Sequence, residues 1–299
     1  MAANDLMDTL RSGGVLVFDG GYGTLFQRMG LPAGASPDLW NTENPEAVQT
    51  IHEAYARAGS QITKTNTFGA ARFGDAAARE EIVRAGVALA VQARQAVPET
   101  PGFVALDLGP SGLMLAPYGD TEEEEVAALY RSLCSVGLEC GADLILIETM
   151  MDLGEALAAL KGAKEALAES YKTVTKKIPV FVTMTYAEGG RTLFGQTAAD
   201  CAEALEEADA DAIGLNCGAG PELAAQVLPQ LRAACSLPLI ANPNAGLPVV
   251  ADGTASYPLQ PEDFAAQLLE LKALGACVLG GCCGTSPTHI AALVQALRA

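Results

Sequence analysis

The feature that most constrains the fold of this 299-residue chain is a regular alternation of apolar runs and helical patterns. The apolar runs are continuous rather than alternating in polarity, which is typical of strands buried on both faces of a parallel sheet. Each run ends near a glycine or a polar residue. Eight strands are predicted, at Val15–Gly21, Ile62–Phe68, Phe103–Gly109, Leu144–Thr149, Val180–Tyr186, Ala212–Cys217, Leu239–Asn244 and Cys277–Cys282.

Segments with helical periodicity lie between these strands. Thr121 opens one of them and has capping-box spacing to Glu124, and Ser286 precedes Pro287 as the start of another. The remaining helices are predicted at Pro45–Ala58, Ala76–Val97, Leu153–Ser170, Thr197–Ala208, Pro221–Ala234 and Pro261–Leu274, and the last one runs from Pro287 to Leu297.

Eight such alternations within one chain favour a TIM barrel, which needs roughly 250 residues. We therefore expect a single-domain (β/α)8 barrel over residues 1–299. The competing architecture is a doubly wound open sheet. The loop Asp19-Gly20-Gly21-Tyr22-Gly23-Thr24 argues against a dinucleotide site after the first strand, because it lacks the G-x-G-x-x-G spacing.

The net charge of the chain limits the kinds of partner that it is expected to bind. It carries 18 Lys and Arg against 36 Asp and Glu, a net charge of −18, which argues against binding nucleic acid through a broad basic face. No apolar run is long enough to span a bilayer, and the first residues contain no apolar signal core. We expect a cytoplasmic protein that binds neither nucleic acid nor membrane.

The stretch Gly280-Gly281-Cys282-Cys283-Gly284 carries the strongest chemical signal. Adjacent side chains on a regular strand point to opposite faces, so the two thiols can face one point only where the backbone turns, and glycine permits that turn. Zinc needs a third protein ligand, and Cys217 also ends an apolar run. In a barrel the ends of the sixth and eighth strands can converge on the face that holds active sites. The alternative is three buried cysteines without a metal.

Polar residues at the other strand ends would share this face of the barrel. A carboxylate such as Glu148 can pair with the ammonium group of an amino acid, while the backbone N–H groups of Gly20 and Gly21 can pair with its carboxylate. Each of these residues could equally be ordinary strand-end structure. The set comprises Asp19, Gly20, Gly21, Asn66, Thr67, Asp107, Glu148, Thr149, Thr183, Thr185, Asn242 and Asn244.

At these positions the chain resembles the homocysteine S-methyltransferase family. Gly109-Pro110-Ser111-Gly112, Pro117-Tyr118-Gly119-Asp120 and Tyr257-Pro258-Leu259-Gln260-Pro261 make it most similar to the homocysteine-binding modules of cobalamin-dependent methionine synthases. The family motifs span nearly the whole chain. They are Asp19-Gly20-Gly21-Tyr22-Gly23-Thr24, Thr65-Asn66-Thr67-Phe68-Gly69, Ile147-Glu148-Thr149, Gly214-Leu215-Asn216-Cys217, Pro243-Asn244-Ala245-Gly246 and Gly280-Gly281-Cys282-Cys283-Gly284-Thr285.

The resemblance implies a (β/α)8 barrel in which Cys217, Cys282 and Cys283 hold zinc and the thiol of homocysteine takes the fourth position. It further implies that Glu148 holds the amino group and that the loop of Asp19, Gly20 and Gly21 holds the carboxylate. Asn244 would sit at the zinc when substrate is absent. The expected product is methionine.

The methyl donor is less constrained. Gly69 stands where betaine-using relatives carry a tyrosine, and the cobalamin motif D-x-H-x-x-G is absent, so His52 and His289 are interpreted as helix-face residues. We expect a methylcorrinoid carried by a separate protein or module, in which case the chain could itself be an excised module. The alternatives are a free donor such as S-methylmethionine, a non-catalytic barrel that binds zinc and a thiol amino acid, and a metal-free barrel enzyme.

Overall fold

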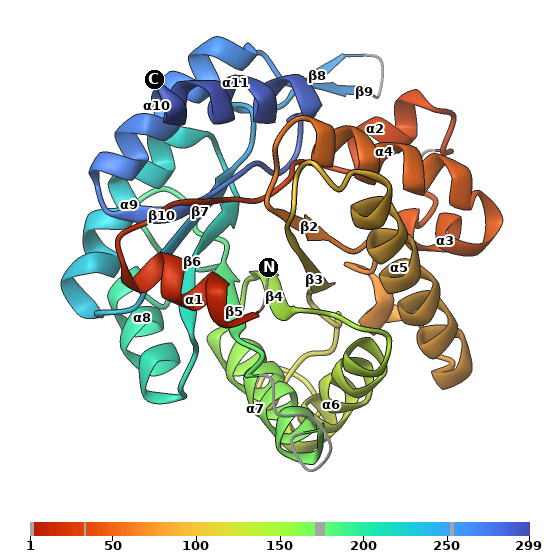
Figure 1. The fold of residues 1–299 in the computed structure, drawn as a ribbon. Coiled ribbons are helices and arrows are strands. Elements are labelled where there is room, and N and C mark those ends of the chain that lie inside the picture. The colour runs from red at the N-terminus through yellow and green to blue at the C-terminus, as the bar shows by residue number, and fades with distance from the viewer. Residues whose placement is uncertain (1–2, 33, 171–176, 252–253) are drawn as a thin grey trace.

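The computed structural model describes residues 3–32, 34–170, 177–251 and 254–299. Eight parallel strands form one sheet in the order β1-β10-β7-β6-β5-β4-β3-β2, and a parallel bridge between Phe18 and Ile62 closes it. Figure 1 shows these strands surrounded by a ring of helices, which confirms the predicted (β/α)8 barrel. The strands are β1 (Leu16–Val17), β2 (Ile62–Lys64), β3 (Phe103–Leu108), β4 (Leu144–Met150), β5 (Val180–Met184), β6 (Ala212–Cys217), β7 (Leu239–Pro243) and β10 (Ala276–Leu279).

The helices follow the predicted order with additions near the amino terminus. The described elements also include two short 3-10 helices and an antiparallel hairpin of β8 (Val249–Ala251) and β9 (Thr254–Ser256). None of the described helices combines the length and the apolar character that crossing a bilayer requires. The helices are α1 (Ala3–Arg11), α2 (Gly23–Arg28), α3 (Trp40–Glu43), α4 (Pro45–Arg57), α5 (Ala76–Ala96), α6 (Glu123–Glu139), α7 (Leu153–Ser170), α8 (Ala198–Glu207), α9 (Pro221–Ala234), α10 (Pro261–Ala273) and α11 (Pro287–Arg298).

Three strands differ most from the prediction, the other strands differing by at most two residues at either end, and the start of one helix also differs. Strands β1 and β2 are shorter than expected, and β10 ends at Leu279, so Cys282 and Cys283 lie in the following loop. The predicted capping box at Thr121 is wrong, because Glu122 occupies the N-cap position of α6 without a side-chain cap. The backbone of Thr121 instead pairs with that of residues 114 and 116.

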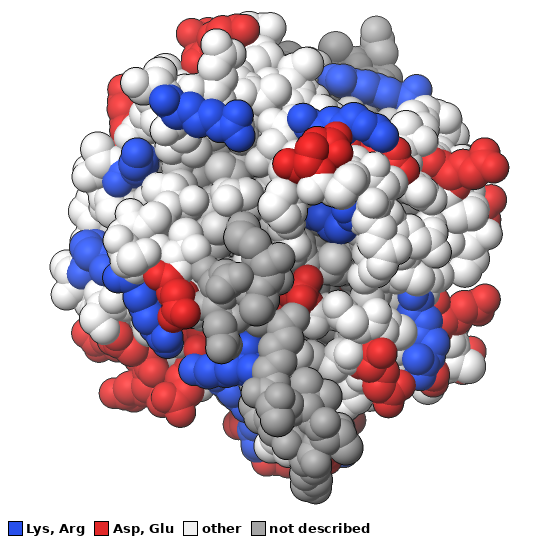
Figure 2. Space-filling view, in the orientation of Figure 1, with Lys and Arg blue, Asp and Glu red and all other residues white. Residues whose placement is uncertain are grey.

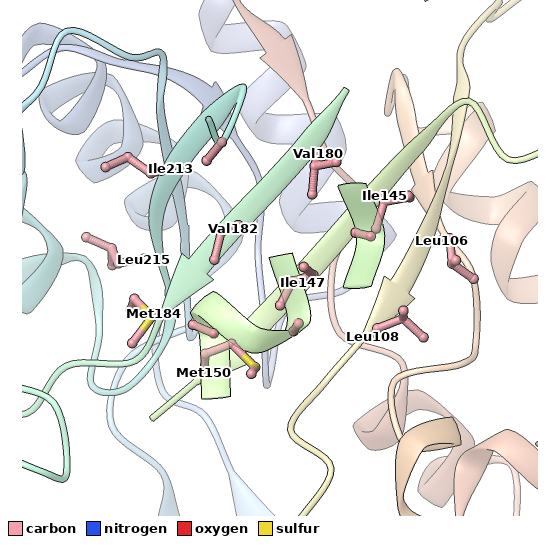
Figure 3. Packing of buried hydrophobic residues seen from close by; sticks show 14 of the residues in the cluster. Leu106, Leu108, Ile145, Ile147, Met150, Val180, Val182, Met184, Ile213 and Leu215 are labelled. Atoms are coloured by element: carbon pink, nitrogen blue, oxygen red, sulfur yellow. The ribbon is translucent and has the colours of Figure 1, made fainter. Parts of the chain in front are cut away.

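Two apolar layers explain why the strands are apolar on both faces. One cluster fills the inside of the barrel and includes Phe18, Ile62 and Phe181, and it continues into Leu6 and Leu10 of α1. Alternate strand residues join a larger cluster between the sheet and the helices, and Figure 3 shows that layer packing on β3 to β6. The barrel is therefore a filled core with α1 packed against its inner layer.

The inward-facing positions change from apolar to polar at the carboxyl ends of the strands. Because strand side chains alternate with a period of two, the residue two places after each inner apolar residue also faces inward. On β2, for example, Lys64 follows Ile62, and on β4 Glu148 follows Leu146. The resulting polar layer lies above the apolar core and contains Lys64, Asp107, Glu148, Thr183, Asn216 and Asn242.

Candidate metal centre

The structure brings the three predicted cysteines together at the mouth of the barrel. Cys217 is the last residue of β6, while Cys282 and Cys283 follow β10, and β7 lies between these two strands. The three Sγ atoms all lie within 4.8 Å of one another, and no other such group of potential metal ligands occurs among the described residues. Cys217 and Cys282 are 65 positions apart in the sequence, and the two intervening βα units of the barrel bring them together.

Local backbone geometry turns each cysteine toward this point. Cys217 adopts a left-handed conformation with φ of +58°, so its side chain leaves the regular alternation of β6. After β10, the N–H of Gly281 donates to the carbonyl of Asp19, and the N–H of Cys282 donates to the carbonyl of Pro243. These bonds anchor the Cys282 and Cys283 loop to the ends of β1 and β7.

Two asparagines connect the loops that carry the cysteines. Asn244 Nδ2 donates to the Gly218 carbonyl at 2.6 Å, and its Oδ1 accepts from the Cys283 N–H at 3.0 Å. Asn216 Oδ1 accepts from the N–H of Thr149 at 2.8 Å, and its Nδ2 lies 3.9 Å from Cys282 Sγ. Asn244 was predicted at the zinc in the substrate-free state, and here it lies against the backbone beside two of the cysteines.

The donor set fits a soft, four-coordinate ion. Two sulfurs bound to one tetrahedral zinc at about 2.3 Å lie about 3.8 Å apart, and sulfurs within 4.8 Å of one another are close enough to share one ion. The hydrogen bond with Cys282, together with burial, raises the pKa of Cys217 to about 12. The hydrogen bond with Cys217 and burial raise the pKa of Cys283 to about 11. The apo cluster therefore holds its protons, and a cation would displace them on binding.

A cavity of about 310 Å³ extends from the cysteines into the barrel. Its volume lies at the lower end of the range for small-molecule sites. Residues from the ends of β2, β3 and β4 line it together with the β1 loop and the cysteines. They include Gly21, Tyr22, Lys64, Asn66, Phe68, Asp107, Glu148, Thr149, Cys217, Cys282 and Cys283.

Buried charged residues are part of the lining of this cavity. Lys64 Nζ lies 3.5 Å from Glu148 Oε2, and both side chains are buried. Burial would lower the pKa of Lys64, but Glu148, Asp19 and Asp107 raise it well above its usual value. Burial, reinforced by the charge of Glu148, raises the pKa of Asp107 well above its ordinary range. The cavity thus presents a cation and an adjacent carboxylate to any ligand.

The predicted carboxylate-binding loop is tightly packed against the cysteine loop. A Cβ on Gly20 would approach Thr285 Oγ1 to 2.5 Å, and a Cβ on Gly21 would approach the Cys282 carbonyl oxygen to 2.6 Å. The N–H of Gly21 donates to Thr285 Oγ1 at 3.0 Å. Asp19 is buried and accepts from the N–H of Lys64 at 2.8 Å. Substrate binding by this loop stays a prediction.

The two histidines lie on helices, as predicted, but both side chains are buried. His52 Nδ1 is 2.9 Å from the hydroxyl of Tyr22, and burial lowers the pKa of His52 to about 3. His289 contacts Ser286 Oγ and the carbonyl of Leu259. These contacts join elements around the site and leave neither ring in the cavity lining.

Lys64 and Asn216 are the principal residues that sequence reasoning did not select. Lys64 stands inside a predicted buried strand, and a lysine in such a place is almost never fully buried unless it is paired. That rule could have identified Lys64 as a site residue. Asn216 directly precedes Cys217, but its contacts with Thr149 and Thr183 depend on the pairing of β4, β5 and β6. No local pattern reveals them.

Comparison with known proteins finds a matching family and curated relatives. A family model described as homocysteine S-methyltransferase matches residues 16–297. Methionine synthase from Mycobacterium leprae (strain TN) is 34% identical over 307 residues, which cover 98% of this chain and 25% of that protein. Methionine synthase from Mycobacterium tuberculosis (strain ATCC 25618 / H37Rv) gives the same identity and coverage. The chain thus spans about a quarter of the length of these curated relatives.

Solved structures with the same fold include a homocysteine methyltransferase, MmuM from Escherichia coli. Its metallated form superposes with a TM-score of 0.79 at 26% identity, covering 98% of this chain and 99% of that one. Its apo form gives a TM-score of 0.73 at 27% identity, covering 94% and 95% of the two chains.

Proposed function

The chain belongs to the homocysteine S-methyltransferase family, and from this premise we propose that it transfers a methyl group to the thiol of homocysteine, giving methionine. Cys217, Cys282 and Cys283 would hold a zinc ion for this reaction. The observation that carries the proposal is that three converging cysteine sulfurs and a buried ion pair line the same cavity. A thiol amino acid has a group that suits each of these two features.

The cysteines and the charged residues of the cavity have separate tasks. Zinc on three thiolates would keep the substrate sulfur deprotonated at neutral pH, because metal binding lowers the pKa of a thiol. Glu148 accepts hydrogen bonds from the substrate ammonium group and so aims the sulfur at the mouth of the barrel. The new carbon–sulfur bond forms as the bond from methyl to donor breaks, with its electron pair left on the donor. The thiol proton is released to solvent.

We infer a methylcorrinoid on a separate protein or module as the methyl donor. This inference is supported by the 34% identity with methionine synthases over 98% of this chain, against 26% with metallated MmuM. A free sulfonium donor such as S-methylmethionine is the alternative. The exposed mouth of a barrel admits either donor to the substrate sulfur.

Metal content and proton release test the site directly. We expect one zinc per native chain, loss of zinc in Cys282→Ser, and release of about one proton when homocysteine binds the zinc-loaded protein. Cys140→Ser is the matched control, because Cys140 is a free, partly buried cysteine outside the cluster and should leave zinc unchanged. Zinc that is absent from the native chain, or that persists in Cys282→Ser, would refute the assignment.

Turnover with two donors tests the reaction. Zinc-loaded protein and homocysteine are incubated with methylcobalamin or with S-methylmethionine, and methionine is quantified. Faster methionine formation from methylcobalamin supports the corrinoid inference, and the reverse order supports a free donor. Stoichiometric binding of zinc and homocysteine without methionine from either donor, even with a corrinoid-carrying protein added, would instead identify a non-catalytic binding barrel.

A further inference from the structure

Tyr257 is a partly buried tyrosine beside the candidate metal centre that the proposed function leaves without a task. It begins the stretch Tyr257-Pro258-Leu259-Gln260-Pro261, which runs from the end of β9 into the start of α10. Its hydroxyl hydrogen-bonds to the sulfur of Cys283, and Cys217 and Cys282 also act electrostatically on it. Tyr257 therefore lies close to all three sulfurs without being one of the candidate ligands.

The ring of Tyr257 packs against the backbone that carries Cys283. A Cβ on Gly284 would overlap with the Cγ of Tyr257 and would approach its Cδ2 to 2.5 Å, so only a glycine leaves room for the ring. Gly284 also has a φ of +82°, in the left-handed region that favours glycine. The glycine that follows the paired cysteines is thus explained by the tyrosine that lies on it.

A chain of hydrogen bonds holds the segment that contains the tyrosine. The N–H of Leu259 donates to the carbonyl of Ala245 at 3.1 Å, and the N–H of Ala245 donates to the carbonyl of Cys283 at 3.0 Å. His289 Nε2 lies 3.0 Å from the carbonyl of Leu259, and its Nδ1 lies 2.8 Å from Ser286 Oγ. Because a carbonyl only accepts, Nε2 carries a proton, and Nδ1 can accept from the serine hydroxyl. These bonds fix the segment relative to the cysteine loop.

We propose that Tyr257 is a positioning residue of the metal centre, whose hydroxyl donates to the sulfur of Cys283 and so limits the negative charge that this ligand gives to the metal. This inference rests on the proposed function and adds a residue to it. Metal binding removes the proton of Cys283, so only the hydroxyl can supply the proton in this bond. The bond then has an ionised acceptor, and such hydrogen bonds are about twice as strong as neutral ones.

The bond has two consequences for the reaction. It stabilises the thiolate form of Cys283, and contacts of this kind around a ligand change metal affinity by about 10–100-fold. It also makes the sulfur a weaker electron donor, which leaves more positive charge on the metal. The metal centre then attracts the thiolate of homocysteine more strongly, so Tyr257 helps to keep the substrate sulfur deprotonated.

Cobalt substitution tests the bond without a methyl donor. Zinc has a filled d shell and gives no useful absorption, whereas Co²⁺ in a sulfur site absorbs through charge transfer from the thiolates. Tyr257→Phe keeps the ring on Gly284 but removes the hydroxyl. We expect the charge-transfer band to move to longer wavelength, because the sulfur lone pairs lose a stabilising donor. Zinc affinity should fall by about 10-fold, and homocysteine binding to the zinc-loaded protein by about threefold.

Two further proteins sharpen the comparison. Tyr118→Phe is the matched control, because it removes the hydroxyl of a tyrosine that is 71% exposed in the loop between β3 and α6, and it should leave the band unmoved. Incorporation of 3-fluorotyrosine at position 257 keeps ring and hydroxyl but makes the hydroxyl a stronger donor, so the band should move to shorter wavelength. Thermal unfolding is measured on each protein. The fluorotyrosine result does not depend on the folding of Tyr257→Phe.

The possible results separate the two proposals. If the native protein binds neither zinc nor cobalt at the cysteines, the metal assignment of the proposed function fails, and the role of Tyr257 fails with it. If metal binds but no methionine is formed, only the proposed reaction fails, and the band still decides the role of Tyr257. A band that is unmoved in both proteins altered at position 257, even with weaker zinc binding, would overturn that role. Band shifts in opposite directions support it.

Discussion

Replacing Asn244 by alanine should loosen the metal centre without touching a cysteine. The asparagine side chain donates to the Gly218 carbonyl and accepts from the Cys283 N–H, at 2.6 and 3.0 Å. Gly218 directly follows Cys217, so the amide ties together the two loops that supply all three sulfurs. It is buried, with 4% of its surface exposed. Asn244→Ala leaves two backbone groups without their partners.

The magnitude follows from those two bonds. Leaving a buried donor or acceptor unpaired costs about 1–3 kcal/mol, so with two such groups the metal-free protein should lose about 2–6 kcal/mol of unfolding free energy. Because the same bonds align the sulfurs, their loss should also weaken metal binding. Loss of a second-layer hydrogen bond lowers metal affinity by about 10–100-fold, equivalent to about 1.4–2.7 kcal/mol.

Competition with a chromophoric chelator measures the zinc affinity, and urea unfolding measures the stability. Asn242→Ala is the matched control: Asn242 lies in β7, two residues before Asn244, and is also buried, but neither polar atom of its side chain has a hydrogen-bond partner among the described residues. The control should change zinc affinity by less than about threefold. Equal zinc affinities for native protein and Asn244→Ala would refute the reasoning that this amide holds the two loops in register.

Three further changes test neighbouring contacts. Gly21→Ala should weaken zinc binding and lower the unfolding free energy by about 2–4 kcal/mol, because its Cβ would lie 2.6 Å from the Cys282 carbonyl oxygen. The Cβ of the control Gly23→Ala would meet no atom within 4 Å, so this variant should change neither zinc binding nor the melting temperature. Asn216→Ala should lower the melting temperature and weaken zinc binding, since the bridge to β4 and the contact with Cys282 Sγ are lost; an unchanged metal affinity would contradict this. Burial raises the pKa of Asp19 to about 6, so its contribution to stability is present below its unfolded pKa and is lost as pH rises through 6. In urea unfolding, the stability of Asp19→Asn relative to the native protein should therefore rise by about 2 kcal/mol between pH 4 and pH 7, and a pH-independent difference would count against this reasoning.

The barrel was predictable because its signal is distributed along the whole chain. Each strand is apolar on both faces, and the structure shows why: Ile147 packs toward the helices while Leu146 fills the barrel interior. A run that must satisfy two apolar layers cannot alternate in polarity. The start of α6 was less predictable, because the Thr121 capping box is a short local pattern that competes with backbone pairing in the loop.

The site was only partly predictable for a related reason. The cysteines could be selected because adjacent thiols between glycines are a local pattern with a direct chemical meaning. The roles of Lys64, Asn216 and Asn244 depend on which strands are neighbours, and so on the closure of the barrel. Strand order brings Glu148 of β4 opposite Lys64 of β2, with β3 between them. No local sequence pattern predicts such a pairing.

The end of the eighth barrel strand, β10, was predicted wrongly, and the reason shows how the chemistry of the site constrains the fold. If β10 had continued to Cys282, as predicted, its adjacent residue Cys283 would have faced the opposite side of the sheet. In the structure the strand ends at Leu279, and the backbone N–H groups of Gly281 and Cys282 donate to carbonyls at the ends of β1 and β7. Two neighbouring thiols can then face Cys217 together. The loss of regular strand pairing at this point allows the three sulfurs to converge. The glycines before Cys282 and the anchoring bonds to Asp19 and Pro243 are therefore as much a part of the candidate metal centre as the sulfurs are.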